Sequence, residues 1–267
     1  MFRKVFVQKS QSHQCADASF CACFNKPKTC NADKIWLISN AADFSVSENI
    51  KQGFDRQAFR KKLGLDDCFV IIYVGAHGIA NHLIQIIQTA EIQKSSKAHF
   101  LLIGDGPQKA NLIEETHRRA LQNVTFLDTV SKSEVLKYIL AADAGASVLK
   151  KSDIFKTIYS NKTFDYFACS KPVLLAIDGI SRKLVEDANA GMFVEPENPA
   201  DFADKILKYI RDPDLGAEHG KNGYTFASIH FDRRLLAGKY LENIEMMLKM
   251  ASDNTAESEP KSGRAGF

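Results

Sequence analysis

The sequence has no apolar run long enough to span a bilayer. Its longest apolar stretch, CFVIIYVGA at 68–76, is far shorter than the ~20 residues that a membrane-spanning helix needs. Residues 1–15 carry basic side chains but no continuous apolar stretch behind them, so they do not form a secretory signal. We therefore expect a soluble, cytoplasmic protein with at most peripheral membrane contact.

The sequence also has no strong excess of charge of either sign. Lysine and arginine number 35 against 32 aspartates and glutamates, which gives a formal net charge of +3. This is too small to indicate nucleic acid as the main partner, although a local basic patch can still hold phosphate. The apolar fraction of 45% and the charged fraction of 25% are those of an ordinary globular protein. Fibrous, collagen-like and wholly disordered chains are therefore excluded.

Paired C-x2-C cysteines, the usual signature of a structural zinc site, are missing. Four of the six cysteines, Cys15, Cys21, Cys23 and Cys30, lie near the start with the spacing C-x5-C-x-C-x6-C. We expect free thiols rather than zinc ligands, and a disulfide framework is not typical of a cytoplasmic chain. Residues 1–33 have no clear helical or strand period and are interpreted as a poorly ordered leader.

Apolar segments of strand length alternate with helical patterns along most of the remaining chain. Strands are expected at 69–75, 99–104, 123–128, 143–149, 171–177 and 191–195. Helices are expected at 55–64, 80–93, 107–121, 131–141, 161–168, 180–189, 199–210, 215–227 and 231–249. Apolar strands that alternate with helices indicate a parallel sheet with helices on both faces. We predict an α/β fold with one doubly wound, Rossmann-like sheet domain over 34–250, and a disordered tail at 251–267.

Ligands of such sheets bind at the carboxyl ends of the strands. The loop GAHG at 75–78 follows the first long strand. Its glycines, Gly75 and Gly78, allow close approach of the backbone to a phosphate, and His77 is placed to donate a hydrogen bond to it. A tight turn with a solvated histidine explains the same residues. Neither a G-x-G-x-x-G nor a G-x4-G-K-[ST] motif is present, so the dinucleotide and P-loop motifs are not supported.

Two further loops carry candidate residues. GDGPQK at 104–109 makes a turn that starts a helix, which turn geometry alone explains. SNKTFDYFACSKP at 160–172 puts Lys162 and Asp165 on one face of a helix. A lysine there is suited to a diphosphate, and a carboxylate one turn later is suited to a ribose hydroxyl. A surface ion pair between the two side chains is the plainer alternative.

Five segments together resemble the C-terminal, nucleotide-binding half of a family 4 glycosyltransferase of the GT-B fold. In chain order they are YVGAHG, HFLLIGDGPQK, NVTFLDTVSKSEVLKYILAADAG, SNKTFDYFACSKPVLLAI and AGMFVEPENPADFADKI. The similarity covers about residues 34–249, and ISNAAD at 38–43 resembles the crossing between the two domains. The resemblance implies retaining transfer of a hexosyl group from a nucleotide diphosphate sugar to a hydroxyl acceptor, in polysaccharide or glycoconjugate synthesis, without cofactor or metal ion.

The resemblance also assigns roles to individual positions. Lys162 and His77 take the catalytic roles, because they face the diphosphate as it departs with negative charge. Donor binding falls to residues of the loops at the carboxyl edge, namely Gly75, Gly78, Gly104, Val130, Ser131 and Asp165. The chain departs from the family pattern at Thr157, where members with a Glu-x7-Glu pattern have an acidic residue, and at Ser160, which replaces the proline of a P-S-K segment.

The matched region is preceded by only 33 residues, too few for the acceptor-binding domain of a complete enzyme of this kind. We expect a truncated chain, or one that works with a separately encoded acceptor domain. The expected partners are a nucleotide sugar and a sugar or lipid-linked sugar acceptor, and nucleic acid is not among them. Two other interpretations stay open, a non-catalytic nucleotide-sugar-binding module and a nucleotide-sugar epimerase of the GT-B type.

Overall fold

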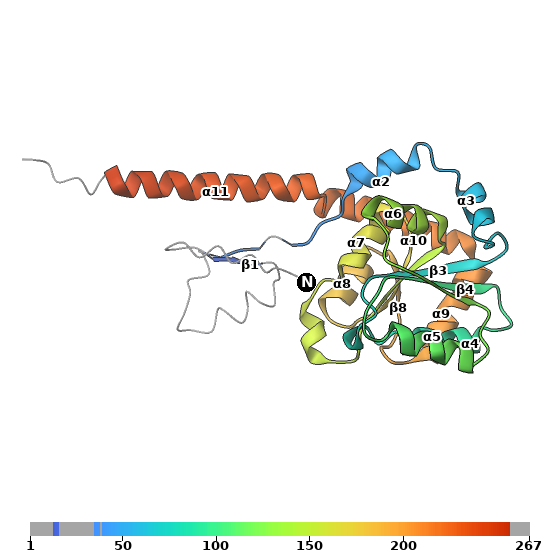
Figure 1. Ribbon diagram of the computed structural model, residues 1–267. Coiled ribbons are helices and arrows are strands. Elements are labelled where there is room, and N and C mark those ends of the chain that lie inside the picture. Colours follow the sequence, from blue (N-terminus) through green and yellow to red (C-terminus); the bar gives the residue numbers. More distant parts are fainter. Residues whose placement is uncertain (1–12, 16–34, 38, 257–267) are drawn as a thin grey trace, which may run out of the picture.

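The computed structural model describes residues 13–15, 35–37 and 39–256. A six-stranded, wholly parallel sheet with the strand order β5-β4-β3-β6-β7-β8 forms its centre (Figure 1). The strands are β3 (Phe69–Val74), β4 (Ala98–Ile103), β5 (Val124–Leu127), β6 (Ala144–Val148), β7 (Val173–Ala176) and β8 (Gly191–Phe193). From β3 the chain moves outward to β5, returns to β6 beside β3, and then moves outward the other way. This is the predicted doubly wound topology.

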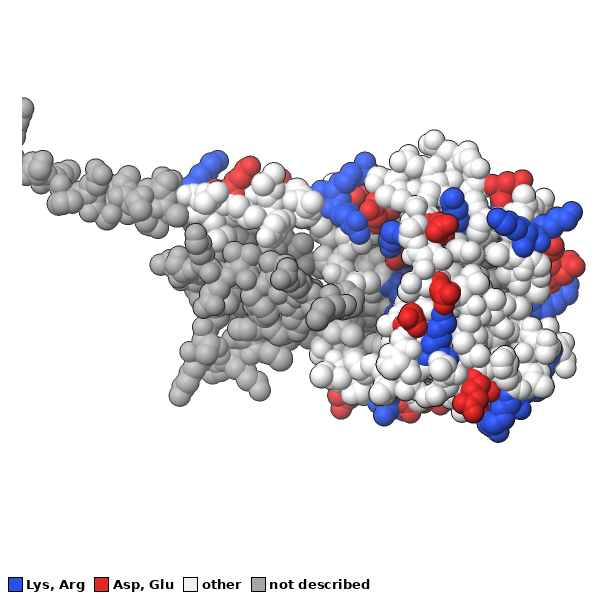
Figure 2. All heavy atoms as spheres, in the orientation of Figure 1, with Lys and Arg blue, Asp and Glu red and all other residues white. Residues whose placement is uncertain are grey.

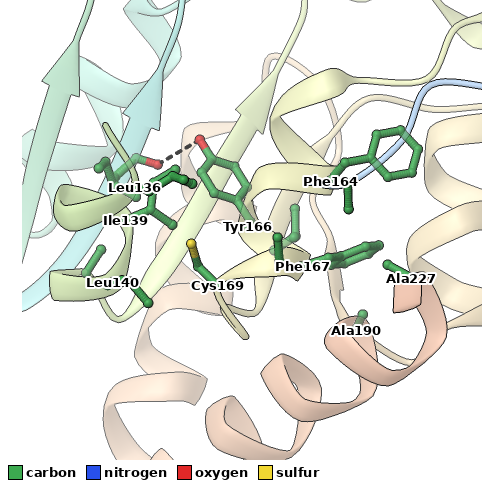
Figure 3. Close-up of a cluster of buried hydrophobic side chains, with 14 of the residues drawn as sticks. Leu136, Ile139, Leu140, Phe164, Tyr166, Phe167, Cys169, Ala190 and Ala227 are labelled. Atoms are coloured by element: carbon green, nitrogen blue, oxygen red, sulfur yellow. Dashed lines mark hydrogen bonds between the residues drawn. The ribbon is translucent and has the colours of Figure 1, made fainter. Parts of the chain in front are cut away.

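Helices cover both faces of the sheet. One face is packed by α4 (Ile84–Ile92), α5 (Lys109–Arg118) and α9 (Pro199–Arg211). The other is packed by α2 (Phe44–Lys51), α6 (Lys132–Ala141), α7 (Asn161–Ala168), α8 (Ile180–Asp187) and α10 (Pro213–His230). Because successive side chains of a strand point to opposite faces, Ile71 and Ile72 of β3 enter different clusters. Figure 3 shows the cluster that contains Ile72, where side chains of α6 and α7 meet.

Two helices begin at the caps that the sequence indicates. The Asp55 side chain accepts a hydrogen bond from the Ala58 amide at 2.9 Å and starts α3 (Arg56–Lys62). Gly64 follows the end of this helix with a φ of 67°, a conformation that glycine adopts at little cost. Ser131 caps α6 in the same way as Asp55 caps α3. All six predicted strands form, with ends within two residues of the prediction.

Two helical predictions are wrong by four or more residues at one end. The helix expected at 80–93 is a 3-10 turn, η2 (Ile79–Asn81), followed by α4. His82 lies between them with a φ of 45°, a left-handed conformation that interrupts the helix. The last helix, α11 (Arg233–Ala256), passes 249 and enters the predicted tail, because no glycine or proline stands between 239 and 256 to end it. Residues 257–267 lie outside the described residues.

The predicted leader contains a strand that the local pattern does not reveal. β1 (His13–Cys15) pairs in parallel with β2 (Ile35–Leu37) in a two-stranded sheet apart from the six-stranded one. Pairing with a distant segment supplies the backbone hydrogen bonds, which a local period cannot show. The prediction for the other residues up to 33, including Cys21, Cys23 and Cys30, falls outside the described residues.

Ala42, in the segment that resembles a domain crossing, is bound to the chain between α10 and α11. The Ala42 amide donates to the Phe231 carbonyl at 2.8 Å, and the Arg233 amide donates to the Ala42 carbonyl at 3.0 Å. The chain is therefore fixed where α10 ends and α11 begins. From this point α11 extends away from the sheet and its covering helices (Figure 1).

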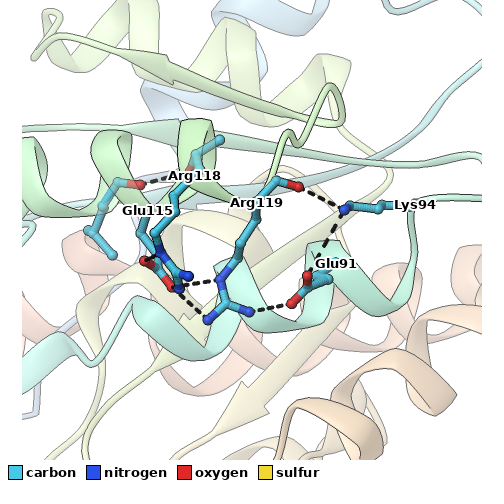
Figure 4. A network of polar contacts seen from close by, with 7 residues as sticks. Glu91, Lys94, Glu115, Arg118 and Arg119 are labelled. Carbon is cyan, nitrogen blue, oxygen red and sulfur yellow. Dashed lines mark hydrogen bonds and ion pairs between the residues drawn. The ribbon is translucent and has the colours of Figure 1, made fainter.

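Charges of both signs are mixed over the described surface. On the face in Figure 2, lysine and arginine alternate with aspartate and glutamate. Figure 4 shows one network, in which Arg119 bonds both Glu115 of α5 and Glu91 of α4. The network ties α4 to α5 through partly buried side chains. Among the described helices, none is long and apolar enough to cross a membrane.

Candidate functional site

The sheet opens between its two central strands at their carboxyl ends. β3 and β6 pair at only two positions, Ile71 with Ala144 and Ile72 with Gly145. On its other side, β3 pairs with β4 along its whole length. The strands beside the opening are those at which the strand order reverses, and ligands of doubly wound sheets bind in this place. The loops after β3 and β6 therefore border the candidate site.

Two glycines hold the loops after β3 and β4 against each other. The Gly75 amide donates to the Ile103 carbonyl at 2.9 Å. A Cβ atom on Gly104 would lie 2.0 Å from the Gly75 carbonyl oxygen, so no larger residue fits there. Both glycines have positive φ angles, 141° for Gly75 and 144° for Gly104, which other residues rarely adopt. The structure therefore gives Gly104 a packing role beneath the Gly75 loop.

Lys162 reaches this glycine loop from the first turn of α7. A Cβ atom on Gly75 would lie 2.7 Å from the Lys162 Cε atom and 3.3 Å from its Nζ atom. The ammonium group stands 5.0 Å from the centre of the Tyr73 ring. No carboxylate of the described residues forms an ion pair with it. Burial lowers the pKa of Lys162 to about 8, and Asp165 opposes this shift. Lys162 is thus a half-buried cation that faces a loop with no side chain at Gly75.

Ser160 fixes the start of α7 beside the site. Its hydroxyl shares a 2.6 Å hydrogen bond with the hydroxyl of Ser147 on β6. Its amide donates to the Ser181 hydroxyl of α8 at 3.1 Å. A proline at this position has no amide hydrogen and no hydroxyl to make these bonds. Ser160, which replaces the proline of the P-S-K segment, therefore ties the helix that carries Lys162 to β6 and α8.

Asp165 pairs with a lysine that the sequence analysis did not single out. Its Oδ1 atom lies 2.5 Å from Lys132 Nζ at the start of α6, and its Oδ2 atom has no donor among the described residues. The alternative of a direct ion pair between Lys162 and Asp165 is therefore wrong. The Ser131 hydroxyl accepts from the Glu134 amide at 3.3 Å as the helix cap, and Val130 packs on the core beside it.

His77 is buried under the loop that carries it. Its side chain is 0% exposed, and its ring lies between those of Tyr73 and Phe126, with centroids 6.0 and 6.1 Å away. Neither ring nitrogen has a hydrogen-bond partner among the described residues. Burial, helped by nearby Lys109, lowers the pKa of His77 to about 4. The alternative of a solvated histidine is therefore wrong, and the contact between this imidazole and a phosphate stays a prediction.

The backbone of the glycine loop offers donors. The amides of Ala76 and Gly78 have no acceptor within the described part of the chain, whereas the His77 amide donates to the Asp105 carbonyl at 2.8 Å. Free amides beside a buried cation form a setting that suits an anion. The loop therefore has two backbone donors available beside Lys162.

Lys109 is a structural residue that the sequence analysis missed. Its ammonium group donates to the Gly104 carbonyl at 2.9 Å and the Leu127 carbonyl at 3.2 Å, and pairs with Asp128 at 2.6 Å. It therefore holds the carboxyl ends of β4 and β5 together. Its position at the end of GDGPQK, the turn that follows β4, was the available signal.

A separate pocket of about 690 Å³ lies at the opposite, amino edge of the sheet. It is lined by residues at the starts of strands, among them Phe69, Lys97, Asp143 and Lys171. Burial lowers the pKa of Lys171 to about 8, much as it does for Lys162. Lys171 follows the end of α7, where a cation is favoured by the helix dipole. This lysine therefore has a structural explanation that Lys162, at the other end of the same helix, lacks.

Comparison with known proteins gives matches over most of the chain. Residues 55–226 match the family model described as glycosyl transferases group 1. An uncharacterized glycosyltransferase of Methanocaldococcus jannaschii, MJ1178, is 27% identical over 215 residues, 76% of this chain and 57% of that protein. The putative teichuronic acid biosynthesis glycosyltransferase TuaH of Bacillus subtilis is 24% identical over 205 residues, 75% of this chain and 49% of that protein. The chain thus spans about half the length of the curated relatives it matches.

Solved structures show the same fold. Anabaena HepE in complex with UDP and glucose has a TM-score of 0.74 and 19% identity, over 87% of this chain and 62% of that one. A glycosyltransferase from Rickettsia africae has a TM-score of 0.77 and 14% identity, over 90% and 64%. The described chain has the fold of the C-terminal half of a GT-B glycosyltransferase. Because the family model covers more than half of the sequence, the chain belongs to the family of group 1 glycosyl transferases.

Proposed function

We propose that this chain binds the diphosphate of a nucleotide sugar between Lys162 and the loop at 75–78. One observation carries the proposal, namely that Lys162 reaches Gly75 with an ammonium group that has no carboxylate partner among the described residues. Burial of a charge without a partner costs free energy. The start of a helix also disfavours a cation. An anionic ligand in the opening accounts for a lysine in this place.

The chemistry of sugar transfer suits such a site. When the bond between sugar and nucleoside diphosphate breaks, negative charge develops on the departing phosphate oxygens. Lys162 and the free amides of Ala76 and Gly78 are in place before the reaction, so they stabilise this charge without reorganising. With the ammonium group supplying the positive charge, we propose that donor binding needs no metal ion.

The ribose and base are assigned to the neighbouring loops. Asp165 uses Oδ1 for Lys132, and its Oδ2 atom is left to accept a ribose hydroxyl. Val130 and Ser131 form the loop that lies next to the base. UDP is bound in the solved HepE structures, which makes UDP the appropriate first probe.

The full reaction that we propose is retaining hexosyl transfer of the family 4 type, in polysaccharide or glycoconjugate synthesis in the cytoplasm. The acceptor that we propose is a sugar or lipid-linked sugar. One observation favours a second candidate, a binding module without turnover. Exposed Thr157 stands where some members have a carboxylate, so this position offers no acid or base.

Calorimetric titration of the full chain with UDP tests the site. We expect binding of UDP with and without a chelator, and much weaker binding of uridine, which lacks the diphosphate. A strict requirement for a divalent cation, or equal binding of uridine and UDP, would contradict the proposal.

Hydrolysis of UDP-glucose separates the two candidate functions. Release of glucose by the chain, with loss of this release in Lys162→Ala, is expected for a transferase half. Tight UDP binding without any release, even when an acceptor-domain fragment from a relative is added, is expected for a binding module.

A further inference from the structure

Tyr166 lies on α7 one turn after Lys162 and is fully buried beneath the candidate site. Its hydroxyl stands 3.0 Å from the Ala146 carbonyl oxygen and 3.3 Å from the Ile72 carbonyl oxygen, either of which accepts its proton. The same hydroxyl accepts from the Val74 amide at 3.3 Å. One side chain of a helix therefore bonds the backbone of two strands, β3 and β6.

Two of these backbone groups, the Val74 amide and the Ala146 carbonyl, lie beyond the last pair of the ladder between β3 and β6. The ladder between β3 and β6 ends at the pair of Ile72 with Gly145. Beyond it, the inward groups of Val74 and Ala146 face the gap rather than each other. Buried backbone groups without a hydrogen bond are costly. The Tyr166 hydroxyl bonds both groups and so joins the two strands where they no longer pair.

The ring of Tyr166 packs closely against the backbone of β6. A Cβ atom on Gly145 would lie 2.3 Å from the Tyr166 ring, so only glycine leaves room for it. Val74, which the hydroxyl holds, is followed directly by Gly75. Lys162, one turn before Tyr166, occupies the space where a side chain at Gly75 would lie. Tyr166 thus connects the helix that carries the cation with the strand that carries the glycine loop.

We infer that Tyr166 is a positioning residue, which sets the separation between Lys162 and the Gly75 loop and thereby the fit of the diphosphate. It does not touch the ligand, since it lies below the opening. The inference rests on the proposed binding of a diphosphate at Lys162.

Tyr166→Phe tests this, because it removes the hydroxyl and keeps the ring. Tyr209→Phe is the matched control, since Tyr209 is also fully buried and its hydroxyl shares a 2.8 Å hydrogen bond with His219, away from the opening. We expect Tyr166→Phe to weaken UDP binding about tenfold, or about 1.4 kcal/mol, and Tyr209→Phe to leave it within about twofold. Both variants are compared in the full chain at a temperature at which circular dichroism shows them folded.

A double-mutant cycle distinguishes positioning from a merely structural role. If Tyr166 acts through Lys162, Tyr166→Phe has little further effect on UDP affinity in a Lys162→Ala background. An equal loss in both backgrounds, or unchanged affinity in the single variant, overturns the inference. Absence of UDP binding by the unaltered chain instead overturns the proposed function, and the inference with it.

Hydrogen exchange provides the test if Tyr166→Phe does not fold. In the unaltered chain, UDP is expected to slow exchange of the Val74 amide. A diphosphate that holds Lys162 also restrains α7, and with it the Tyr166 hydroxyl to which this amide donates. Unchanged exchange at Val74 under saturating UDP overturns the inference.

Discussion

Replacing Lys162 with alanine is expected to weaken UDP binding by roughly ten- to a hundredfold while the chain stays folded. A hydrogen bond to a charged group contributes about 1.5–3 kcal/mol, and every 1.4 kcal/mol is about tenfold in affinity. The fold is expected to tolerate the change, because the ammonium group has no ion pair to lose among the described residues and lies at a helix start that disfavours it. The melting temperature should be unchanged or slightly higher.

Lys171→Ala is the control for this experiment. Burial lowers the pKa of Lys171 to about 8, as it does for Lys162, but Lys171 lines the pocket at the amino edge of the sheet. Calorimetry with UDP measures affinity, and thermal denaturation of both variants measures stability. The reasoning is refuted if Lys162→Ala unfolds the chain but its folded fraction binds UDP normally. It is equally refuted if Lys171→Ala causes the larger loss of affinity.

Three further results are expected. Burial lowers the pKa of Lys162 to about 8, and a bound anion favours the charged form of this lysine. UDP affinity should therefore be full at pH 7 and fall as pH rises above about 8. Calorimetry from pH 7 to 9.5 should show this fall, and Lys162→Ala should abolish it. Gly75→Ala places a side chain at a φ of 141° against Lys162, so urea denaturation should show a loss of about 1–3 kcal/mol, whereas Gly53→Ala, with open space around it, should be nearly neutral. Lys109→Met leaves strand-end carbonyls unpaired and should lower the free energy of unfolding by about 1–3 kcal/mol. The control, Lys183→Met, loses one exposed pair with Asp187 and should lower it by under about 1 kcal/mol. Equal losses would refute the role of Lys109.

Local patterns of sequence were enough to predict the six-stranded sheet and the capped starts of α3 and α6. The run FVIIYV is apolar on both faces and becomes the central strand β3. Ser131 precedes a helical pattern and caps α6 as expected. These features depend on residues a few positions apart, so period and capping chemistry are sufficient to find them.

The side-chain partners at the site could not be predicted in this way. Asp165 lies one turn from Lys162 in sequence, yet its partner is Lys132, 33 positions away. Tyr166 has a hydroxyl that bonds Ile72, 94 positions away. Such pairs depend on how α6, α7 and β3 meet in space, which no local period specifies. The loop pattern leaves His77 as either a phosphate donor or a solvated side chain, and it does not reveal that the ring is buried.

A crystal structure of the full chain with UDP tests the central claim most directly. The account predicts that the diphosphate lies at the carboxyl edge of the sheet, within hydrogen-bond distance of Lys162 Nζ and of the amides of Ala76 and Gly78. A diphosphate bound beside Lys171 in the amino-edge pocket, with the Lys162 ammonium group still against Tyr73 and without a phosphate contact, would contradict it.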